Sequence, residues 1–251
     1  MEENVMGDIS RSLEKEIVES KNQIRNRLPE IVVTACALVL DVILLCFGLC
    51  DIFAFSLIFF GALWNFFMRA NKLFACIVSF VVCTIFALIS IRLNMYGSAF
   101  LHICFYLPTQ LIYFYENQEI EDVSIKYNKH LSRAGTIGAV ISLWIFALCM
   151  AFVLYEVGEQ YFVVDSVCVT LLTFSVFLSN GEYKEYWFAR IVACGTNFAV
   201  WLFLSFAMNF AGGSLVIALL FLMYTVMDII HYILWQKKKR IFTSNRESVA
   251  D

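Results

Sequence analysis

Residues 73–91 read LFACIVSFVVCTIFALISI and contain no charged side chain. A helix rises about 1.5 Å per residue, so this stretch would be about 28 Å long and would match the hydrocarbon core of a bilayer. The chain contains eight such apolar stretches, the second of them near the lower length limit. They cover residues 31–49, 52–68, 73–91, 97–115, 136–155, 161–180, 186–208 and 214–235. The sequence therefore predicts an all-α polytopic membrane protein with eight transmembrane helices.

The positive charges between these stretches predict the orientation of the chain. With a cytoplasmic N-terminus, the five inner segments hold five, two, three, one and five Lys or Arg residues in chain order. The outer connections hold Arg92, and Arg190 lies inside the seventh stretch. Short cytoplasmic loops of membrane proteins are enriched in Lys and Arg. We therefore expect a multi-pass protein whose N- and C-termini are both cytoplasmic.

Composition limits what lies outside the membrane. Hydrophobic residues make up 61% of the chain, and its net charge of −3 gives no reason to expect a nucleic-acid partner. The loops are too short to fold into a separate extramembrane domain. We expect a cytoplasmic N-terminal segment at 1–29, a transmembrane domain at 30–236 and a cytoplasmic basic tail at 237–251, held at the anionic inner leaflet. Eight of the nine cysteines lie within the apolar stretches, which indicates packing rather than a metal site.

Two parts of the membrane domain resemble each other. The fourth and eighth stretches both begin with Gly-Ser, and both later carry a tyrosine followed after four residues by a polar side chain, as Tyr106 with Gln110 and Tyr224 with Asp228. The third and seventh stretches also match over a short segment. This pattern predicts two parallel three-helix repeats joined by a linking helix, a 3+1+3 arrangement, plus one extra N-terminal helix. Repeat one covers about 52–115, the linking helix about 136–155 and repeat two about 161–235.

Polar and aromatic side chains recur at helical spacing in three of the stretches, which places each set on one face of its helix. An ionised carboxylate facing mid-bilayer lipid costs about 2.5–3.5 kcal/mol on insertion scales, so we expect these faces to point into the bundle. For any single residue, interhelical hydrogen bonding explains the pattern as well as substrate contact does. The three faces together favour a substrate pathway. The candidate substrate-binding residues are Tyr106, Gln110, Arg190, Cys194, Asn197, Trp201, Tyr224 and Asp228.

The sequence also predicts local roles for several other residues and for one proline. Asp41 forms either a structural pair or a coupling-ion site, with the pair favoured. Asp165 is placed to cap its own helix, and Trp64 to anchor the second stretch at the interface. Arg190 is shallow enough to extend to the cytoplasmic headgroups. Pro108 removes a backbone hydrogen bond and should bend or loosen the fourth stretch.

Two blocks of the sequence resemble the bacterial PnuC family of nicotinamide riboside transporters. The first is Tyr96-Gly97 followed by Tyr106-Leu107-Pro108-Thr109-Gln110, similar to the family's Tyr-Gly…Tyr-x-Pro-x-Gln stretch. The second is Asp165-Ser166 followed by Tyr183-Lys184-Glu185-Tyr186-Trp187. The resemblance covers about residues 50–236 and agrees with the 3+1+3 layout.

The resemblance implies a carrier in the bacterial inner membrane, related in architecture to sugar-translocating SWEET proteins. Nicotinamide riboside is the usual substrate of the family, and relatives take deoxynucleosides or thiamine. The family implies facilitated diffusion by alternating access, with the substrate trapped by a cytoplasmic kinase. The resemblance also leads us to expect a homo-oligomer. No resident cofactor is implied.

The chain departs from the family pattern at the expected binding site. Family members carry Trp-x-x-x-Asn early in the seventh stretch, and the matching positions here are Arg190 and Cys194. A glutamine of the sixth stretch is matched by Val176. Asn197 and Trp201, one turn deeper, are the substitute pair that we expect to contact substrate.

Two other classes of membrane protein would require other sequence features. The sequence has no His-Glu-x-x-His metal motif, Gly-x-Ser-x-Gly elbow, aspartyl-protease motif pair or ATP-binding loop, so we expect neither an intramembrane enzyme nor a primary pump. A non-catalytic membrane subunit stays open as an alternative, because interhelical hydrogen bonds alone would account for the polar faces.

Overall fold

The computed structural model describes residues 27–67, 72–116, 129–210 and 213–250. In these ranges each of the eight predicted stretches is helical. The bounds are a first helix at Arg27–Cys46, α2 at Ile52–Phe67, α3 at Lys72–Arg92, α4 at Tyr96–Leu101, the π-helical turn η1 at His102–Tyr106, α5 at Leu107–Glu116, α7 at Arg133–Glu156, α8 at Phe162–Asn180, α9 at Tyr186–Ala207 and α10 at Ser214–Ala250. Most of the expected segment 1–29 lies outside the described residues.

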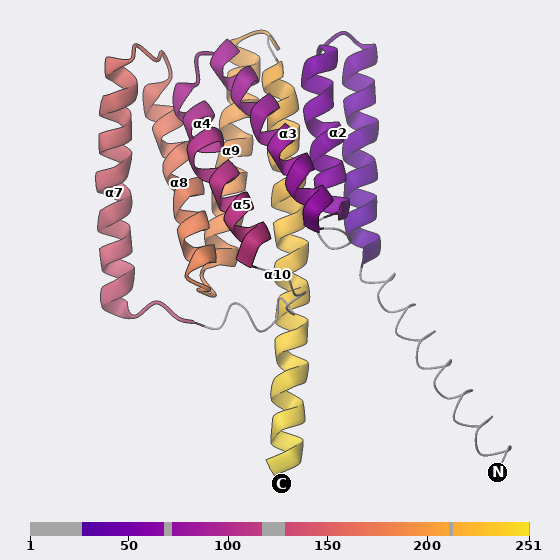
Figure 1. Ribbon diagram of the computed structural model, residues 1–251, viewed down its shortest axis with the longest axis vertical. Coiled ribbons are helices and arrows are strands. Elements are labelled where there is room, and N and C mark those ends of the chain that lie inside the picture. Colours follow the sequence, from indigo (N-terminus) through magenta and orange to yellow (C-terminus); the bar gives the residue numbers. More distant parts are fainter. Residues whose placement is uncertain (1–26, 68–71, 117–128, 211–212, 251) are drawn as a thin grey trace, which may run out of the picture.

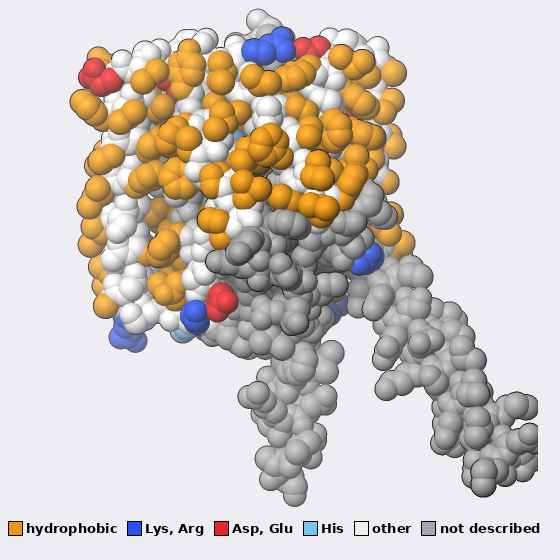
Figure 2. Space-filling view, viewed as in Figure 1, with side chains coloured by type: hydrophobic (Ala, Val, Ile, Leu, Met, Phe, Trp, Pro, Cys, Tyr) orange, Lys and Arg blue, Asp and Glu red, His pale blue; other side chains and the backbone are white. Residues whose placement is uncertain are grey.

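Six of these helices are long and apolar enough to cross a membrane: the first helix, α3, α7, α8, α9 and the 214–237 part of α10. The apolar part of α2 is shorter, at Ile52–Trp64, and the fourth stretch is divided into α4, η1 and α5. Figure 2 shows apolar side chains spread widely over the side of the bundle, with charged side chains near its two ends. An apolar surface of this extent is stable in lipid and not in water.

Helices from the two halves of the chain form a closed ring. α2 packs on α3, and α3 packs on α4, η1 and α5. In the second half, α8 packs on α9 and α9 on α10. Two further contacts close the ring, because α4 packs on α8 and α10 packs on α2 (Figure 1). Side chains that point inward from these helices therefore share one interior.

Two helices lie outside this ring. α7 packs mainly on α8 and stands at the edge of the molecule in Figure 1, with large exposed side chains such as Trp144, Leu148 and Phe152. The first helix stands beside α2 at the opposite edge. Helices with so little buried surface are expected where lipid supplies the missing apolar contacts.

Two glycines allow α2 and α10 to approach closely. A Cβ built on Gly61 of α2 would lie 2.7 Å from Leu220 Cδ1 and 3.4 Å from Tyr224 Oη. Gly213, just before α10, has a φ of +84°, and its Cβ would lie 2.8 Å from Ala54 Cβ. Small residues let helix backbones come together in membranes, where close packing takes the place of the hydrophobic effect. The contact that closes the ring between the halves of the chain depends on these positions.

The predicted loosening at Pro108 is confirmed as a π-helical turn. Pro108 has no N–H to give to the carbonyl four residues earlier, and its ring crowds that carbonyl. The helix widens just before it, and the N–H of Leu107 bonds to the oxygen of His102 five residues back. The fourth stretch thus remains helical throughout while its hydrogen-bond ladder is interrupted in the middle of the membrane domain.

Two carboxylates from the α7–α8 corner bind the first turn of α4. Glu159 Oε2 accepts from the N–H groups of Tyr96 at 2.9 Å and Gly97 at 3.3 Å. Asp165 Oδ2 accepts from the Ser98 N–H at 2.9 Å, and Asp165 Oδ1 accepts from the Ser98 hydroxyl. The expectation that Asp165 caps its own helix is therefore wrong. It satisfies the free donors of a helix in the other half of the chain.

The two ends of the molecule differ in charge. Among the described residues at the end that carries the start of α4, Arg92 is the one Lys or Arg, and it pairs with Asp51 at 3.2 Å. The opposite end carries Lys129, which pairs with Glu182 at 3.1 Å, together with Arg27, Arg133, Lys184 and Lys237. α10 extends beyond the predicted membrane stretch 214–235 and continues as a helix through the basic segment.

The Glu159 contact predicts a pH-dependent stability. Burial and the nearby negative charge of Asp165 raise the pKa of Glu159 from 4.5 to about 8, against the two N–H groups, which lower it. At a pH between these two values, Glu159 is protonated in the folded protein and ionised in the unfolded chain. Stability should therefore fall as the pH rises from about 4.5 to about 8, by at most about 1.4 kcal/mol per pH unit, and should level off above that range.

Glu159→Gln should flatten this slope, because the Gln oxygen still accepts from Tyr96 and carries no titrating proton. Melting of the purified protein in detergent between pH 5 and 9 measures it. Glu182→Gln, the same change in an exposed ion pair, is the control and should keep the slope of the unaltered protein. An unchanged slope in Glu159→Gln would contradict the assignment.

Candidate functional site

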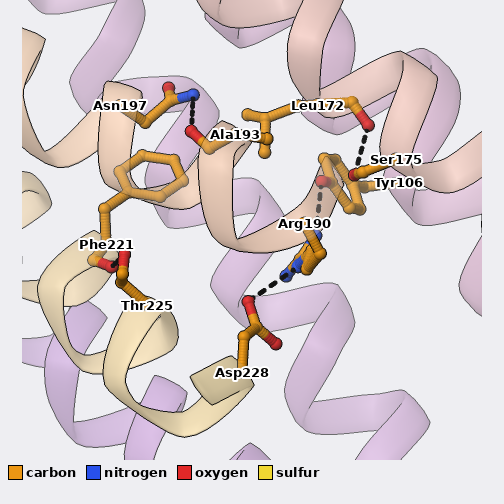
Figure 3. A network of polar contacts seen from close by, with 9 residues as sticks. All are labelled: Tyr106, Leu172, Ser175, Arg190, Ala193, Asn197, Phe221, Thr225 and Asp228. Carbon is orange, nitrogen blue, oxygen red and sulfur yellow. Dashed lines mark hydrogen bonds and ion pairs between the residues drawn. The ribbon is translucent and has the colours of Figure 1, made fainter. Parts of the chain in front are cut away.

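An arginine at the centre of the ring joins three helical segments. Arg190 of α9 donates from Nε to Asp228 Oδ2 of α10 at 3.3 Å and from Nη1 to the Tyr106 hydroxyl of η1 at 2.9 Å (Figure 3). The side chains of Arg190 and Asp228 are 14% and 12% exposed. The expectation that Arg190 extends to the headgroups is therefore wrong, because its charge is neutralised inside the bundle.

Helical spacing explains why these groups meet. Arg190, Cys194, Asn197 and Trp201 follow one another at steps of four, three and four residues, so they form one row along α9. The row faces α10, its most extensive neighbour in the bundle. The Cys194 thiol lies within hydrogen-bonding reach of the Asp228 carboxylate. Four of the predicted binding residues, Tyr106, Arg190, Cys194 and Asp228, thus form one cluster.

Two polar atoms deeper in the same row have no partner among the described residues. Asn197 and Trp201 are both fully buried. The Asn197 amide donates to the Ala193 carbonyl of its own helix at 2.9 Å, which leaves Oδ1 unpaired, and the Trp201 indole Nε1 is unpaired as well (Figure 3 shows Asn197). Buried polar groups in proteins are nearly always hydrogen-bonded. Within the described part of the chain, one helix face thus holds a buried acceptor and a buried donor that have no partner.

Aromatic rings from the first half of the chain face this row. His102 of η1 stacks on Phe86 of α3 with centroids 3.7 Å apart, and Tyr106 stacks on His102 at 5.1 Å. Phe86 meets the Trp201 ring edge-on at 6.0 Å. His102 is fixed by its Nδ1, which lies 2.8 Å from the Ser98 carbonyl. These rings form a column beside the polar row of α9.

Tyr224 of α10 extends the aromatic wall toward α2. Its ring meets Trp64 edge-on at 5.9 Å and Phe221 at 6.5 Å. Trp64 was expected to be an interfacial anchor, and the structure places it instead against a candidate binding residue. Flat apolar walls with a few converging polar groups are typical of small-molecule sites.

One predicted site residue has a side chain outside the described ones. Two residues that the sequence did not indicate lie in the cluster. Gln110 lies on α5 one turn after Tyr106, but its side chain is outside the described ones. Phe86 and Phe221 were not predicted. They are ordinary apolar residues in apolar helices, and no sequence signal separates them from residues that face lipid.

Asp41 of the first helix lies apart from this cluster. It is fully buried, and neither of its carboxylate oxygens has a hydrogen-bond partner among the described residues. The structural pair that we expected for it is not found there. The described part of the chain also contains no group of three or more metal-ligating side chains.

A ring of apolar helices around an enclosed polar and aromatic cluster is an arrangement that multi-pass membrane transporters use. Residues 51–237 match the family model described as "Nicotinamide mononucleotide transporter", and the chain belongs to that family. The resemblance to the PnuC family is thereby confirmed. The first helix, with Asp41, precedes the matched region.

A solved structure supports the fold. The chain is similar to the protein of the "Crystal structure of the Vitamin B3 transporter PnuC", with a TM-score of 0.65 and 19% sequence identity, over 83% of this chain and 90% of that one. No curated protein matches the sequence.

The Arg190–Asp228 pair predicts an asymmetric response to mutation. Asp228→Ala would leave the guanidinium without its counter-charge, and breaking a buried pair in this way costs about 3 kcal/mol or more. The double variant Arg190→Met with Asp228→Leu removes both charges and should recover most of that loss. Denaturant titration in detergent micelles measures both.

Arg92→Ala, which breaks the exposed pair with Asp51, is the matched control and should cost less than about 1 kcal/mol. If the Asp228 single variant and the double variant lost the same free energy of unfolding, charge pairing with Asp228 would not be the reason that Arg190 lies inside the bundle.

Proposed function

We propose that this protein mediates uptake of a vitamin-like nucleoside, with nicotinamide riboside as the first candidate, by facilitated diffusion with alternating access. The observation that carries this proposal is the row on α9 in which Asn197 Oδ1 and Trp201 Nε1 are buried and have no hydrogen-bond partner among the described residues. The matching family is described as transporting nicotinamide mononucleotide, and the similar solved protein is titled a vitamin B3 transporter. Those descriptions support a ligand of the same chemical class here.

Each side chain of the cluster has a role suited to a nucleoside. The rings of Tyr106, Trp201 and Tyr224 offer flat surfaces on which a heterocycle stacks. Asp228 accepts hydrogen bonds from ribose hydroxyls. Asn197 Oδ1 accepts from an amide or hydroxyl of the ligand. Gln110 and Cys194 complete the proposed binding set.

The proposed architecture has eight spans, as two parallel three-helix repeats (52–115 and 161–235) with α7 as the linking helix and the first helix as an addition. The order of packing around the ring supports it, because α2, α3 and the fourth stretch are followed by α8, α9 and α10. In this arrangement the substrate site lies where the two repeats face each other.

The same arrangement suggests how access alternates. The Arg190–Tyr106 hydrogen bond crosses from one repeat to the other and closes the end near the start of α9. At the opposite end, Glu159 and Asp165 hold α4 against the α7–α8 corner. Opening either end requires one of these links to break. The π-helical turn before Pro108 lies between them and is where the fourth stretch can bend.

We propose the bacterial inner membrane as the location, with both termini cytoplasmic. The excess of Lys and Arg at the end opposite Arg92 supports that orientation. A homo-oligomer stays a prediction that the family resemblance suggests.

The proposal predicts the effect of the two unpaired side chains on transport. Asn197→Ala and Trp201→Ala should each lower uptake of radiolabelled nicotinamide riboside into proteoliposomes by at least tenfold, because each removes a polar group that only the ligand satisfies. Ser205→Ala, one turn further along the same row, is the control. The Ser205 hydroxyl already bonds to the Trp201 carbonyl at 2.7 Å, so this variant should transport normally.

Normal uptake by folded Asn197→Ala and Trp201→Ala proteins would contradict the proposed site. Uptake of thiamine or another nucleoside in place of nicotinamide riboside would reassign the substrate. No uptake of any of them by the unaltered protein would favour a non-catalytic subunit.

A further inference from the structure

The guanidinium of Arg190 is only partly used by the protein. A guanidinium carries five N–H groups, and the contacts from described residues engage one on Nε and one on Nη1. The contact with Asp228 is single and 3.3 Å long, whereas charge-assisted hydrogen bonds are usually about 2.7–2.9 Å. Three N–H groups of a buried cation are therefore available to an acceptor that enters the ring.

The position of this cation matches one end of a ligand site. Asn197 lies seven residues after Arg190 on the same face, which is about 10 Å along the helix. That distance suits a nucleoside with a charged group at one end. Asn197 Oδ1 and Trp201 Nε1, which have no partner in the part of the chain that the structure describes, would contact the other end. The Tyr106 ring, whose centroid is 6.0 Å from Arg190 Cζ, flanks the space next to the cation.

Arginine selects for anions by its shape as well as its charge. Its planar fork matches the two oxygens of a carboxylate or phosphate, and it binds either with paired hydrogen bonds. We propose that Arg190 makes this site selective for nucleosides that carry an anionic group, either a carboxylate on the ring or a phosphate on the sugar. This inference rests on the proposed function, and within the same class of vitamin-like nucleosides it favours an anionic member over nicotinamide riboside.

The role of Asp228 changes when such a ligand binds. The Arg190–Asp228 pair has no net charge, and a ligand anion would replace the carboxylate at the guanidinium. Asp228 would then face the positive ring of a pyridinium nucleoside or its hydroxyls. A zwitterionic ligand satisfies both members of the pair, whereas a ligand with a positive ring and a neutral amide satisfies Asp228 alone.

Calorimetric binding of three probes to the purified full-length protein tests the proposal. Nicotinamide riboside carries a neutral amide, nicotinic acid riboside a ring carboxylate, and nicotinamide mononucleotide a phosphate. We expect at least one of the two anionic probes to bind tenfold or more tightly than the amide. A preference for the carboxylate probe or for the phosphate probe identifies which anion the site recognises.

Variants then assign the preference to Arg190. Arg190→Gln should reduce it to less than threefold, and Arg190→Lys, which keeps the charge without the fork, should give an intermediate value. Arg92→Gln, the same change in the exposed pair with Asp51, should keep the preference. If Arg190→Gln does not fold, the neutral double variant Arg190→Gln with Asp228→Asn is measured in its place, and its preference should also fall to less than threefold.

Equal or tighter binding of the amide by the unaltered protein would overturn the inference and leave the proposed function intact. The inference would also be overturned, and the proposed function left intact, if the Arg190→Gln variant kept the preference for the anionic probe. Failure of the unaltered protein to bind all three probes would overturn the proposed function, and the inference with it.

Discussion

The structure depends on keeping one pair of opposite charges away from lipid. An isolated Arg or Asp within a transmembrane helix is costly, and pairing inside a bundle lowers that cost. Arg190 and Asp228 lie on adjacent helices of the second half of the chain, and the third member of the cluster, Tyr106, comes from the first half. The ion pair therefore requires α9 and α10 to turn one face inward, and the tyrosine requires the other half of the chain to cover it. A closed ring of helices satisfies both requirements.

Closing that ring also brings the candidate ligand-binding side chains together in its interior. Once the row on α9 faces inward, Asn197 and Trp201 are fully buried beyond the ion pair, and the Trp201 ring contacts Phe86 of α3. Their unpaired atoms would be destabilising in a protein that never bound a ligand. We propose that in a carrier they are binding groups that are ready before substrate arrives, since less free energy is then spent on ordering the site. The close contact of α2 with α10 at Gly61 holds the opposite wall in place.

Much of the fold was predictable because the bilayer imposes a length and a polarity on each span. The eight apolar stretches follow from that constraint, and the loosening before Pro108 follows from the N–H that proline lacks. Partners that come from distant helices were not predictable. Asp165 looked like a local cap, and only the packing of α4 on α8 makes Ser98 its partner. The depth of Arg190 was not predictable either, because a position near a helix end does not show whether a partner such as Asp228 lies inside the bundle. Phe86 carried no signal, since apolar residues line both the lipid face and the interior of membrane helices.

The central claim is that one ligand site lies inside the ring, open in turn to each side of the membrane. Cys194 provides a native probe, because its thiol is buried in that row between Arg190 and Asn197. A variant that keeps Cys194 and lacks the other eight cysteines, reconstituted in proteoliposomes, can be exposed to a membrane-impermeant thiol reagent added to either side. The account predicts slow modification from both sides, slowed further by saturating ligand from the vitamin B3 nucleoside class. A thiol that is never modified, or is modified at a rate that no such ligand changes, would contradict it.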